Sequence, residues 1–259
     1  MKNLMNFRKT VITLSLLTIV YLICSAHFIW TETSGIATVG KEHLINLFFG
    51  EVNFSQKEIA GGRLDEMDGL KSIYINPKNV EKELQLVKQK DRFTAKFTPE
   101  ETGVYQILTT NTVAKVMDLR KSSLGIVKPM YYSRQIIFCP DKANSDNLKS
   151  TNLKPYFDLD LIPDFSNSKL NTFSVNQPIN FYSYFKKNPI KGGKIFAYAP
   201  NTWAKEIDAN EKGLCTFTPL WEGQYVIDWV YTENSPGTYM DKSFDSFRHR
   251  AVLTINVVK

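Results

Sequence analysis

Residues 96–107 read KFTPEETGVYQI, and residues 216–227 read TFTPLWEGQYVI. The two stretches match at a constant offset of 120 residues, and the matched pairs are Phe97/Phe217, Thr98/Thr218, Pro99/Pro219, Gly103/Gly223, Tyr105/Tyr225 and Ile107/Ile227. A repeat in which a turn, a glycine and a tyrosine keep the same spacing indicates two structurally similar units. The pattern therefore predicts a chain built from two related domains.

The Gly-x-Tyr part of the repeat is typical of the tyrosine corner of immunoglobulin-like sandwiches, in which the ring packs inward and the hydroxyl bonds to the backbone. The remaining sequence agrees with this class, because it consists of short β-branched and aromatic runs bounded by Gly, Pro, Asn and Asp clusters. These runs include HLINLFF, KSIYINP, VYQILTT, QIIFC, INFYSYF, KIFAYAP and AVLTINVV. We expect an all-β protein with two immunoglobulin-like antiparallel β-sandwich domains.

The first 26 residues have the composition of a cleaved signal peptide. Three basic residues and no acid stand in the first ten positions, residues 11–23 are apolar apart from Thr and Ser, and Cys24-Ser25-Ala26 supplies small residues for signal peptidase. Ile23 before the cysteine argues against a lipoprotein signal. An uncleaved anchor is the alternative, although the apolar run is shorter than the roughly 20 residues of a spanning helix. We expect cleavage after Ala26 and a periplasmic or secreted protein.

The domain boundaries follow from these features. Residues 140–154, PDKANSDNLKSTNLK, are polar and poor in apolar side chains, as a linker should be. The expected organisation is a signal peptide at 1–26, a first β-sandwich at 27–139, the linker at 140–154 and a second β-sandwich at 155–259.

Charge and cysteine content exclude several classes of protein. The formal net charge is +6, and loss of the three basic residues of the signal peptide would leave +3. The remaining Lys and Arg are dispersed without interleaved aromatic residues, so nucleic acid is not an expected partner. Cys139 and Cys215 lie in strand-like runs in different halves of the chain, and two buried thiols are expected rather than a disulfide. A CxxC or clustered Cys/His pattern is absent from the sequence, so a structural zinc site is not indicated.

His27 is the central candidate for function. Cleavage after Ala26 would make it the first residue of the mature protein, so its α-amine and its imidazole Nδ1 could close a chelate ring on one metal ion. Imidazole suits zinc, copper, nickel and iron, and a divalent transition metal is the expected cofactor. The alternative is that His27 merely begins the first strand.

Three further residues are candidate metal ligands: His43, His249 and Glu51. His43 begins a strand-like run, where a surface histidine is an equally good interpretation. His249 stands between Arg248 and Arg250 at the entry to the last strand, and two flanking cations disfavour a bound cation beside it. Glu51 ends an FFGE turn and could supplement imidazole ligands.

Motifs for common enzyme chemistry are missing from the sequence. It has no nucleophile elbow, GxGxxG, P-loop or HExxH motif, so a non-enzymatic protein is expected. Trp203, Trp221 and Trp229 could form a sugar-stacking platform, although tryptophans near such corners are usually core residues. Asp158 and Asp160 alternate onto one face of a predicted strand, which we expect to be exposed to solvent.

Several stretches of this chain together resemble a known family. They are AHFIW at 26–30, FFGE at 48–51, the run from FDLDLIPD to INFYSYFKKNPIKGGKIFAYAP at 157–200, ANEKGLCTFTPLWEGQYVI at 209–227 and ENSPGTYMDKSFDSFRHRAVLTINV at 233–257. The sequence resembles domain-of-unknown-function family 4198, which is grouped with periplasmic components of cobalt and nickel uptake systems.

The resemblance implies an exported protein of two β-sandwiches that handles nickel or cobalt, with a membrane metal transporter as a possible partner. The family's N-terminal histidine corresponds to His27, and its late histidine corresponds to His249. Many members carry a Gly-His pair at the end of the early strand, where this chain has Gly50-Glu51. A carboxylate at that position would make the ligand set less rich in nitrogen.

Three functions of different classes fit the sequence. The first is a non-enzymatic periplasmic accessory protein that binds nickel or cobalt. The second is a copper oxidase that resembles lytic polysaccharide monooxygenases, which would need His43 or His249 beside His27 and an aromatic residue such as Tyr239 near the metal. The third is a structural or adhesive β-sandwich protein without a metal.

Overall fold

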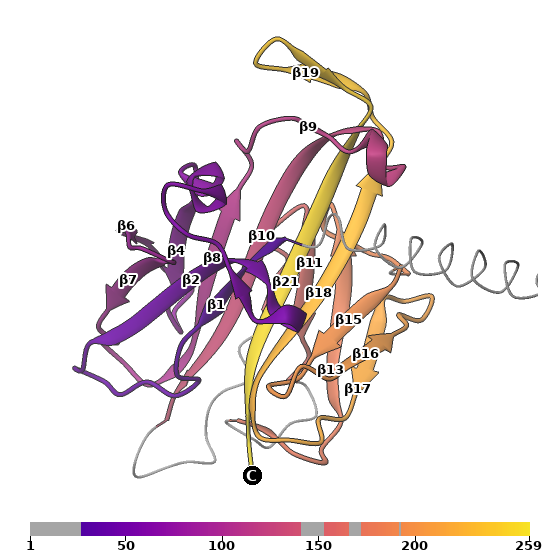
Figure 1. The fold of residues 1–259 in the computed structure, drawn as a ribbon. Coiled ribbons are helices and arrows are strands. Elements are labelled where there is room, and N and C mark those ends of the chain that lie inside the picture. The colour runs from indigo at the N-terminus through magenta and orange to yellow at the C-terminus, as the bar shows by residue number, and fades with distance from the viewer. Residues whose placement is uncertain (1–26, 141–152, 166–171, 192) are drawn as a thin grey trace, which may run out of the picture.

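The computed structural model describes residues 27–140, 153–165, 172–191 and 193–259 (Figure 1). The predicted signal peptide at 1–26 and most of the predicted linker, residues 141–152, lie outside the described residues. Nearly all regular structure in the described part is β, as expected, and its short helices are the 3₁₀ turns η1 (Val52–Phe54), η2 (Arg63–Met67) and η3 (Arg120–Ser122). Among the described residues, no helix has the length and hydropathy needed to cross a membrane.

A ten-stranded sheet runs through the whole molecule (Figure 1). Its strand order is β16 (Ala204–Ile207), β15 (Ile195–Tyr198), β18 (Gly223–Glu233), β21 (Ser246–Val258), β10 (Ile126–Cys139), β8 (Gly103–Asn111), β4 (Lys71–Ile75) and β5 (Glu81–Leu84). Two short strands complete it, with β9 (Met117–Asp118) on β10 and β12 (Phe173–Ser174) on β21.

Three smaller sheets accompany the large one. The first contains β1 (Phe28–Glu32), β2 (His43–Glu51), β7 (Phe93–Phe97) and β6 (Val87–Lys88), with β3 (Gln56–Lys57) beside β2. The second contains β11 (Leu159–Pro163), β13 (Ile179–Phe185) and β14 (Asn188–Pro189), with β17 (Leu214–Phe217) beside β13. The third is the hairpin of β19 (Gly237–Tyr239) and β20 (Lys242–Phe244), which projects beyond the large sheet.

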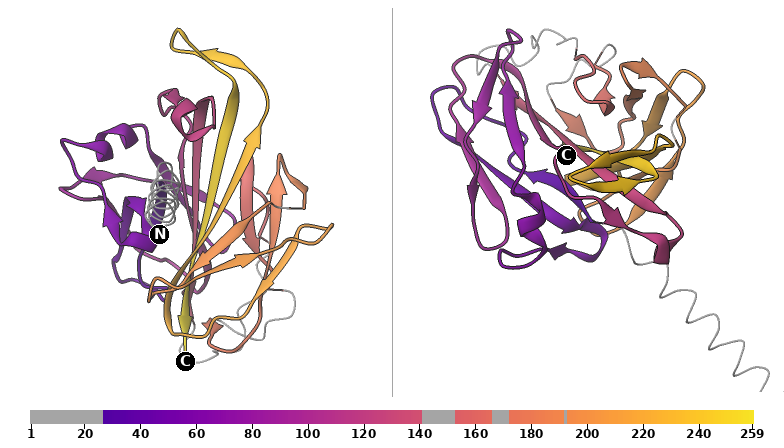
Figure 2. Two further views of the ribbon diagram at one scale, coloured as in Figure 1. Left: turned by 45° about the vertical axis from the view of Figure 1, so that its right-hand side comes forward. Right: turned by 90° about the horizontal axis from the view of Figure 1, so that it is seen from above.

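The first and second of these smaller sheets cover opposite faces of the large sheet, and each forms a hydrophobic core with it. Alternate residues of a strand point to opposite faces, and along β10 Tyr131 and Ile137 join the core under the sheet of β1, β2 and β7. Tyr132 and Ile136 join the other core, which lies against the sheet of β11, β13 and β17. Figure 2 shows these outer sheets on either side of the long central strands. The architecture is therefore layered β-sandwich packing, which confirms the all-β prediction.

The two predicted sandwiches, 27–139 and 155–259, share this central sheet. β10 pairs with β21 in parallel, from Val127 opposite Ser246 to Gln135 opposite Thr254. The end of β10 pairs antiparallel with β8. The two halves are therefore joined by backbone hydrogen bonds between strands, in addition to the covalent chain.

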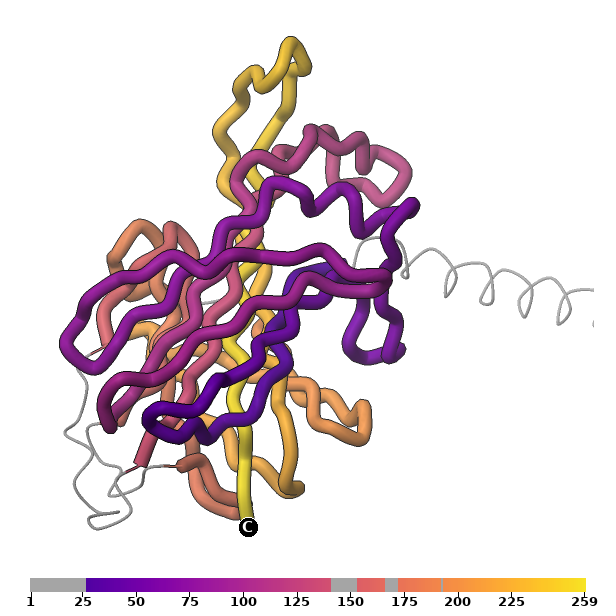
Figure 3. Tube along the Cα trace, turned by 90° about the vertical axis from the view of Figure 1, so that its left-hand side faces the viewer, coloured from indigo at the N-terminus to yellow at the C-terminus, as the bar shows by residue number. Residues whose placement is uncertain are grey.

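The N-terminal strand lies over the C-terminal half of the sheet. Phe28 and Trp30 of β1 form a small buried cluster with Phe48 of β2, Val226 of β18 and Val252 of β21. Figure 3 shows this first segment, in indigo, crossing the yellow β21. The start of the described chain is thereby fixed against its last strand.

Both tyrosine corners are present at equivalent places. The Tyr105 hydroxyl donates to Glu101 O at 2.9 Å and accepts from Glu101 N at 3.2 Å. The Tyr225 hydroxyl accepts from the backbone N–H groups of Leu220 and Trp221 at 3.2 and 3.0 Å. Both rings are buried, so the tyrosine corners that the Gly-x-Tyr pattern predicts are both present.

The glycines of the repeat are required by close approach of a proline. Gly103 and Gly223 have φ angles of +140° and +118°, which favour glycine. A Cβ atom on Gly103 would lie 2.5 Å from Pro77 Cγ, and one on Gly223 would lie 2.6 Å from Pro200 Cγ. The similarity between the two halves therefore extends to Pro77 and Pro200, which lie outside the two aligned stretches, just after the end of a neighbouring strand.

Two details concern buried polar groups. Cys139 and Cys215 are free and buried, as expected.

The expectation that Asp160 faces solvent is wrong, because its side chain is buried and binds the buried Arg134 at 3.0 and 2.6 Å. This ion pair joins β10 to β11, and the backbone N–H groups of Tyr156 and Phe157 also donate to Asp160.

We predict that Tyr105→Phe and Tyr225→Phe each lower the free energy of unfolding by about 0.5–1.5 kcal/mol, because each removes the hydrogen bonds between the tyrosine hydroxyl and the backbone. Chemical denaturation followed by circular dichroism measures the effect. Since the central sheet is shared, both variants should shift the same single transition.

Tyr184→Phe is the matched control, because this tyrosine is only half buried, and it should leave the midpoint unchanged. Two separate transitions, each shifted by only one of the corner variants, would show that the halves unfold independently.

Candidate functional site

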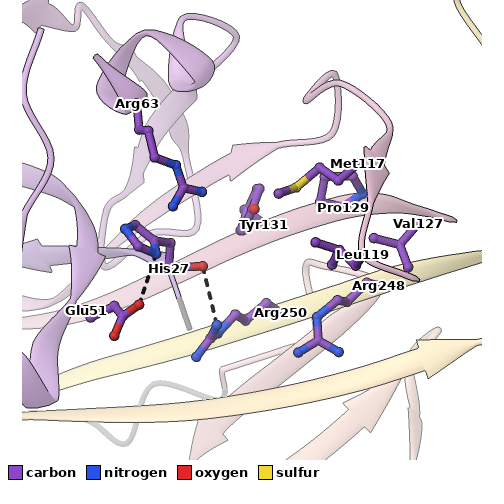
Figure 4. A pocket seen from close by; sticks show the side chains of 10 residues that line it. All are labelled: His27, Glu51, Arg63, Met117, Leu119, Val127, Pro129, Tyr131, Arg248 and Arg250. Carbon is purple, nitrogen blue, oxygen red and sulfur yellow. Dashed lines mark hydrogen bonds and ion pairs between the residues drawn. The ribbon is translucent and has the colours of Figure 1, made fainter. Parts of the chain in front are cut away.

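A cavity of about 280 Å³ lies where β1 begins, on the face of the central sheet that β1 covers. It collects side chains from the first strands, from η2, from the β9 region and from β10 and β21, as Figure 4 shows. Its lining residues are His27, Glu51, Arg63, Met117, Leu119, Val127, Pro129, Tyr131, Arg248 and Arg250. The candidate residues His27 and Glu51 therefore lie together in this cavity.

The imidazole of His27 is held between two carboxylates. Its Nδ1 lies 3.1 Å from Glu51 Oε1, and its Nε2 lies 2.5 Å from Glu58 Oε1. The ring also packs against Phe49, with 5.5 Å between the ring centroids. Each ring nitrogen thus has one carboxylate partner, and the ring orientation is fixed from both sides.

The strand arrangement explains why both carboxylates reach His27. Phe28 pairs with Gly50, so the residue before Phe28 lies beside Glu51. The chain then turns back into β3, which pairs Gly50 with Lys57 and brings Glu58 to the same place. Gly50 has φ +154°, and a Cβ there would lie 2.0 Å from Gln56 O. Any side chain at Gly50 would therefore push the β2–β3 turn away from His27.

Arg250 fixes the backbone of His27 from the central sheet. Its Nη1 donates to His27 O at 3.3 Å, and its guanidinium stacks over the Phe28 ring at 4.3 Å. Two further bonds, of 2.7 and 2.6 Å, run to the buried Asp228. Burial alone would lower the pKa of Arg250. The charge of Asp228 and its hydrogen bonds act in the opposite sense, and the pKa of Arg250 is raised. The side chain of Arg250 is therefore engaged by Asp228 and by the backbone at the start of β1.

His43 lies at the far end of β2 from His27. It precedes Gly50 by seven positions along the strand, and at about 3.3 Å per residue this corresponds to roughly 23 Å. Its Nε2 bonds to Thr33 Oγ1 at 2.8 Å, its ring packs on Phe97, and burial lowers its pKa. His43 is a buried histidine of the first sandwich and does not join the cavity.

His249 lies next to Arg250 but on the opposite face of β21, since neighbouring residues of a strand alternate. Its Nδ1 lies 3.2 Å from the Tyr132 hydroxyl and its Nε2 lies 3.2 Å from Glu233 Oε2. Burial lowers its pKa, although Glu233 acts in the opposite sense. The structure thus separates His249 from His27 by the thickness of the central sheet.

The remaining candidates also lie elsewhere. Tyr239 is on the projecting hairpin, where its hydroxyl donates to Val113 O at 3.2 Å. Trp229 is buried in the second core. Trp203 and Trp221 form an edge-to-face pair at the surface, with 5.5 Å between their centroids. Neither a second histidine nor the candidate Tyr239 therefore lies beside His27, although Phe49 and Tyr131 do.

The sequence did not indicate Glu58, Arg63 or Arg248 as site residues. Glu58 reaches His27 only because the β2–β3 turn folds back, and Arg63 comes from η2. Arg248 was considered only as an unfavourable neighbour of His249, yet alternation along β21 turns it toward the cavity. Alternation places Arg248 on the same face of β21 as Arg250, but the sequence alone does not show that this face borders the cavity.

Side chains alone supply few metal donors. Within the part of the chain that the structure describes, no group of three or more His, Cys, Asp and Glu side chains is placed to hold an ion. The Nδ1 to Oε1 separation of 3.1 Å does fit two ligands of one ion, since bonds of about 2.0–2.1 Å place such atoms roughly 2.9–3.4 Å apart at angles of about 90–110°. A third donor would be the α-amine of His27 after cleavage.

Comparison with known proteins adds little to this site. No family model and no curated protein sequence matches the chain. A solved structure with some similarity is that of a DUF4785 family protein from Legionella pneumophila subsp. pneumophila str. Philadelphia 1, with 11% identity and a TM-score of 0.30. The match covers 79% of this chain and 52% of that chain, so this chain spans about half the length of the matched protein. A likeness of this degree carries no argument about function, and the resemblance to family 4198 stays a prediction.

Proposed function

We propose that this chain is an exported, non-enzymatic protein that binds one divalent transition-metal ion at its mature N-terminus. The α-amine and Nδ1 of His27 and the carboxylate of Glu51 would hold the ion. The observation that carries the proposal is the position of Glu51, which is buried and lies 3.1 Å from Nδ1. Two lone pairs facing each other at this distance need a cation or a proton between them.

Glu58 supports this interpretation from the other side of the ring. A metal-binding histidine usually donates its second ring N–H to a carboxylate, which fixes the tautomer and leaves the first nitrogen free to bind. Glu58 at 2.5 Å from Nε2 is placed for that role. In the proposed metal-bound state, Nε2–H would donate to Glu58 and the lone pair of Nδ1 would face Glu51.

Handling of nickel or cobalt, with delivery to a membrane transporter, is the biological role that the resemblance to family 4198 suggests. Two nitrogen donors and one oxygen donor leave further coordination positions for water or for a ligand group. The copper oxidase alternative has less support, because His43 and His249 both lie away from His27.

A structural protein without a metal is the second candidate, and one observation favours it. An imidazolium that donates one N–H to Glu51 and the other to Glu58 would satisfy the same two contacts. In that case His27 would lock the first strand to the β2–β3 turn. The tests below separate the two functions.

We predict that protein recovered from the periplasm of an export-competent host begins with the sequence HFIW. N-terminal sequencing or intact mass measures this directly. A product that retains Met1 would remove the α-amine from the ligand set and leave the structural interpretation as the better one.

We predict that the processed protein binds one equivalent of Ni²⁺, Co²⁺ or Cu²⁺ in calorimetric titration. Glu58→Gln should weaken binding about 10- to 100-fold, because it removes the negative charge that orients the ring and makes it a stronger ligand. His27→Ala should abolish binding, and so should one extra residue placed before His27.

Affinity should fall with decreasing pH, because the ligands must lose protons to bind. Cu²⁺ should bind most tightly whatever the biological metal is.

Glu222→Gln is the control, since Glu222 is exposed and pairs with Lys259 away from the cavity, and it should bind metal like the unchanged protein. Normal binding by the extended protein would contradict the role of the α-amine.

A further inference from the structure

The cavity beside His27 also contains a half-buried arginine, Arg248. Its backbone pairs with β10 and β18, but among the described residues its guanidinium group makes no hydrogen bond or ion pair, and the nearby Asp228 is bound by Arg250. The other two arginines are engaged, because Arg250 binds Asp228 and Arg63 lies 3.4 Å from Glu66. Figure 4 shows Arg248 and Arg250 on the side of the cavity away from Arg63.

Removal of a guanidinium group from water is unfavourable unless an anion or hydrogen-bond acceptors replace the water. Burial lowers the pKa of Arg248, and the neighbouring charge of Arg250 acts in the same sense. Replacement of Arg248 by a neutral residue should therefore not harm the fold. Such a residue in a cavity is typical of a binding site, where an interaction with a ligand compensates for the unfavourable burial.

The rest of the cavity selects the kind of anion. Its wall near Arg248 is apolar and consists of Met117, Leu119, Val127 and Pro129. A volume of about 280 Å³ equals roughly nine water molecules at about 30 Å³ each, which suits a small organic molecule. Glu51 at the far end repels a second negative charge. These features favour a singly charged ligand with an apolar body over phosphate or sulfate.

We propose that this cavity binds a small organic monocarboxylate, with its carboxylate on the guanidinium of Arg248 and its apolar body against Leu119, Val127 and Pro129. Planar guanidinium and carboxylate groups match in a two-bond geometry. The inference stands on Arg248 and the apolar wall, and it does not depend on a metal at His27.

The test is calorimetric titration of the exported protein with benzoate after metal has been removed on a chelating resin. Benzoate should bind and raise the melting temperature, whereas benzyl alcohol, a neutral analogue of similar shape, should not. Arg248→Gln should weaken benzoate binding about 10- to 100-fold, as expected for the loss of charged hydrogen bonds, with an unchanged or higher melting temperature. Arg92→Gln is the control, because Arg92 pairs with Asp91 outside the cavity, and it should bind benzoate normally.

Two further variants keep the proposal falsifiable. Leu119→Glu leaves Arg248 in place but adds a carboxylate to the wall, so it should also abolish benzoate binding. Glu51→Gln should strengthen benzoate binding while it weakens metal binding, which separates this proposal from the metal site. Equal affinity of Arg248→Gln and the unchanged protein, binding of inorganic phosphate in place of benzoate, or no binding of benzoate at all would overturn it.

Discussion

The parallel pairing of β10 with β21 is the constraint on which the rest of the structure depends. Both strands are buried on both faces, and together they connect the halves of the chain in one sheet. A strand in this position must supply two cores at once, so its apolar residues do not alternate with polar ones. The two outer sheets can pack on opposite faces only because these two central strands carry apolar residues on both sides.

The same constraint explains the buried charges. A residue such as Arg134 in the middle of β10 cannot reach solvent from either face, and it is therefore paired with Asp160 on the covering sheet. Arg250 on β21 is paired with Asp228 on the adjacent strand β18. A buried pair is weak evidence for stability, but loss of one partner leaves an uncompensated charge. These pairs specify which strands meet, and Arg250 also positions the start of β1.

The sequence was sufficient for the fold class and for the corners. The spacing of Gly103 and Tyr105, repeated at Gly223 and Tyr225, fixes a local geometry that does not depend on distant strands. It was not sufficient for the shared sheet, because a two-residue period tells which residues share a face but not which strands become neighbours. Asp160 was misjudged for the same reason, since its alternation was visible and its partner strand was not.

The candidate site shows a similar limit. His27 and Glu51 could be proposed as candidates from sequence, because the position after the predicted cleavage site and the FFGE sequence at the end of β2 are local features. Glu58 and Arg248 could not, because they reach the cavity through the β2–β3 turn and through the central sheet. His43 and His249 carried the right chemistry, but the strand length and the strand alternation place them elsewhere. Residue type indicates which side chains could act as ligands, and the pairing of strands decides which of those side chains lie in the same site.

The contact between Arg250 and His27 spans 223 positions of the chain, and this has a consequence for biogenesis. Since translation runs from β1 toward β21, the cavity can be assembled only after β21 has been synthesised. Until then, the cluster around Phe28 and Trp30 lacks Val252 of β21, and part of its aromatic surface stays uncovered. A chain without β21 therefore lacks both part of the cluster around Phe28 and the arginine wall of the cavity, so the first described strand and the cavity depend on a segment more than 200 positions further along the chain.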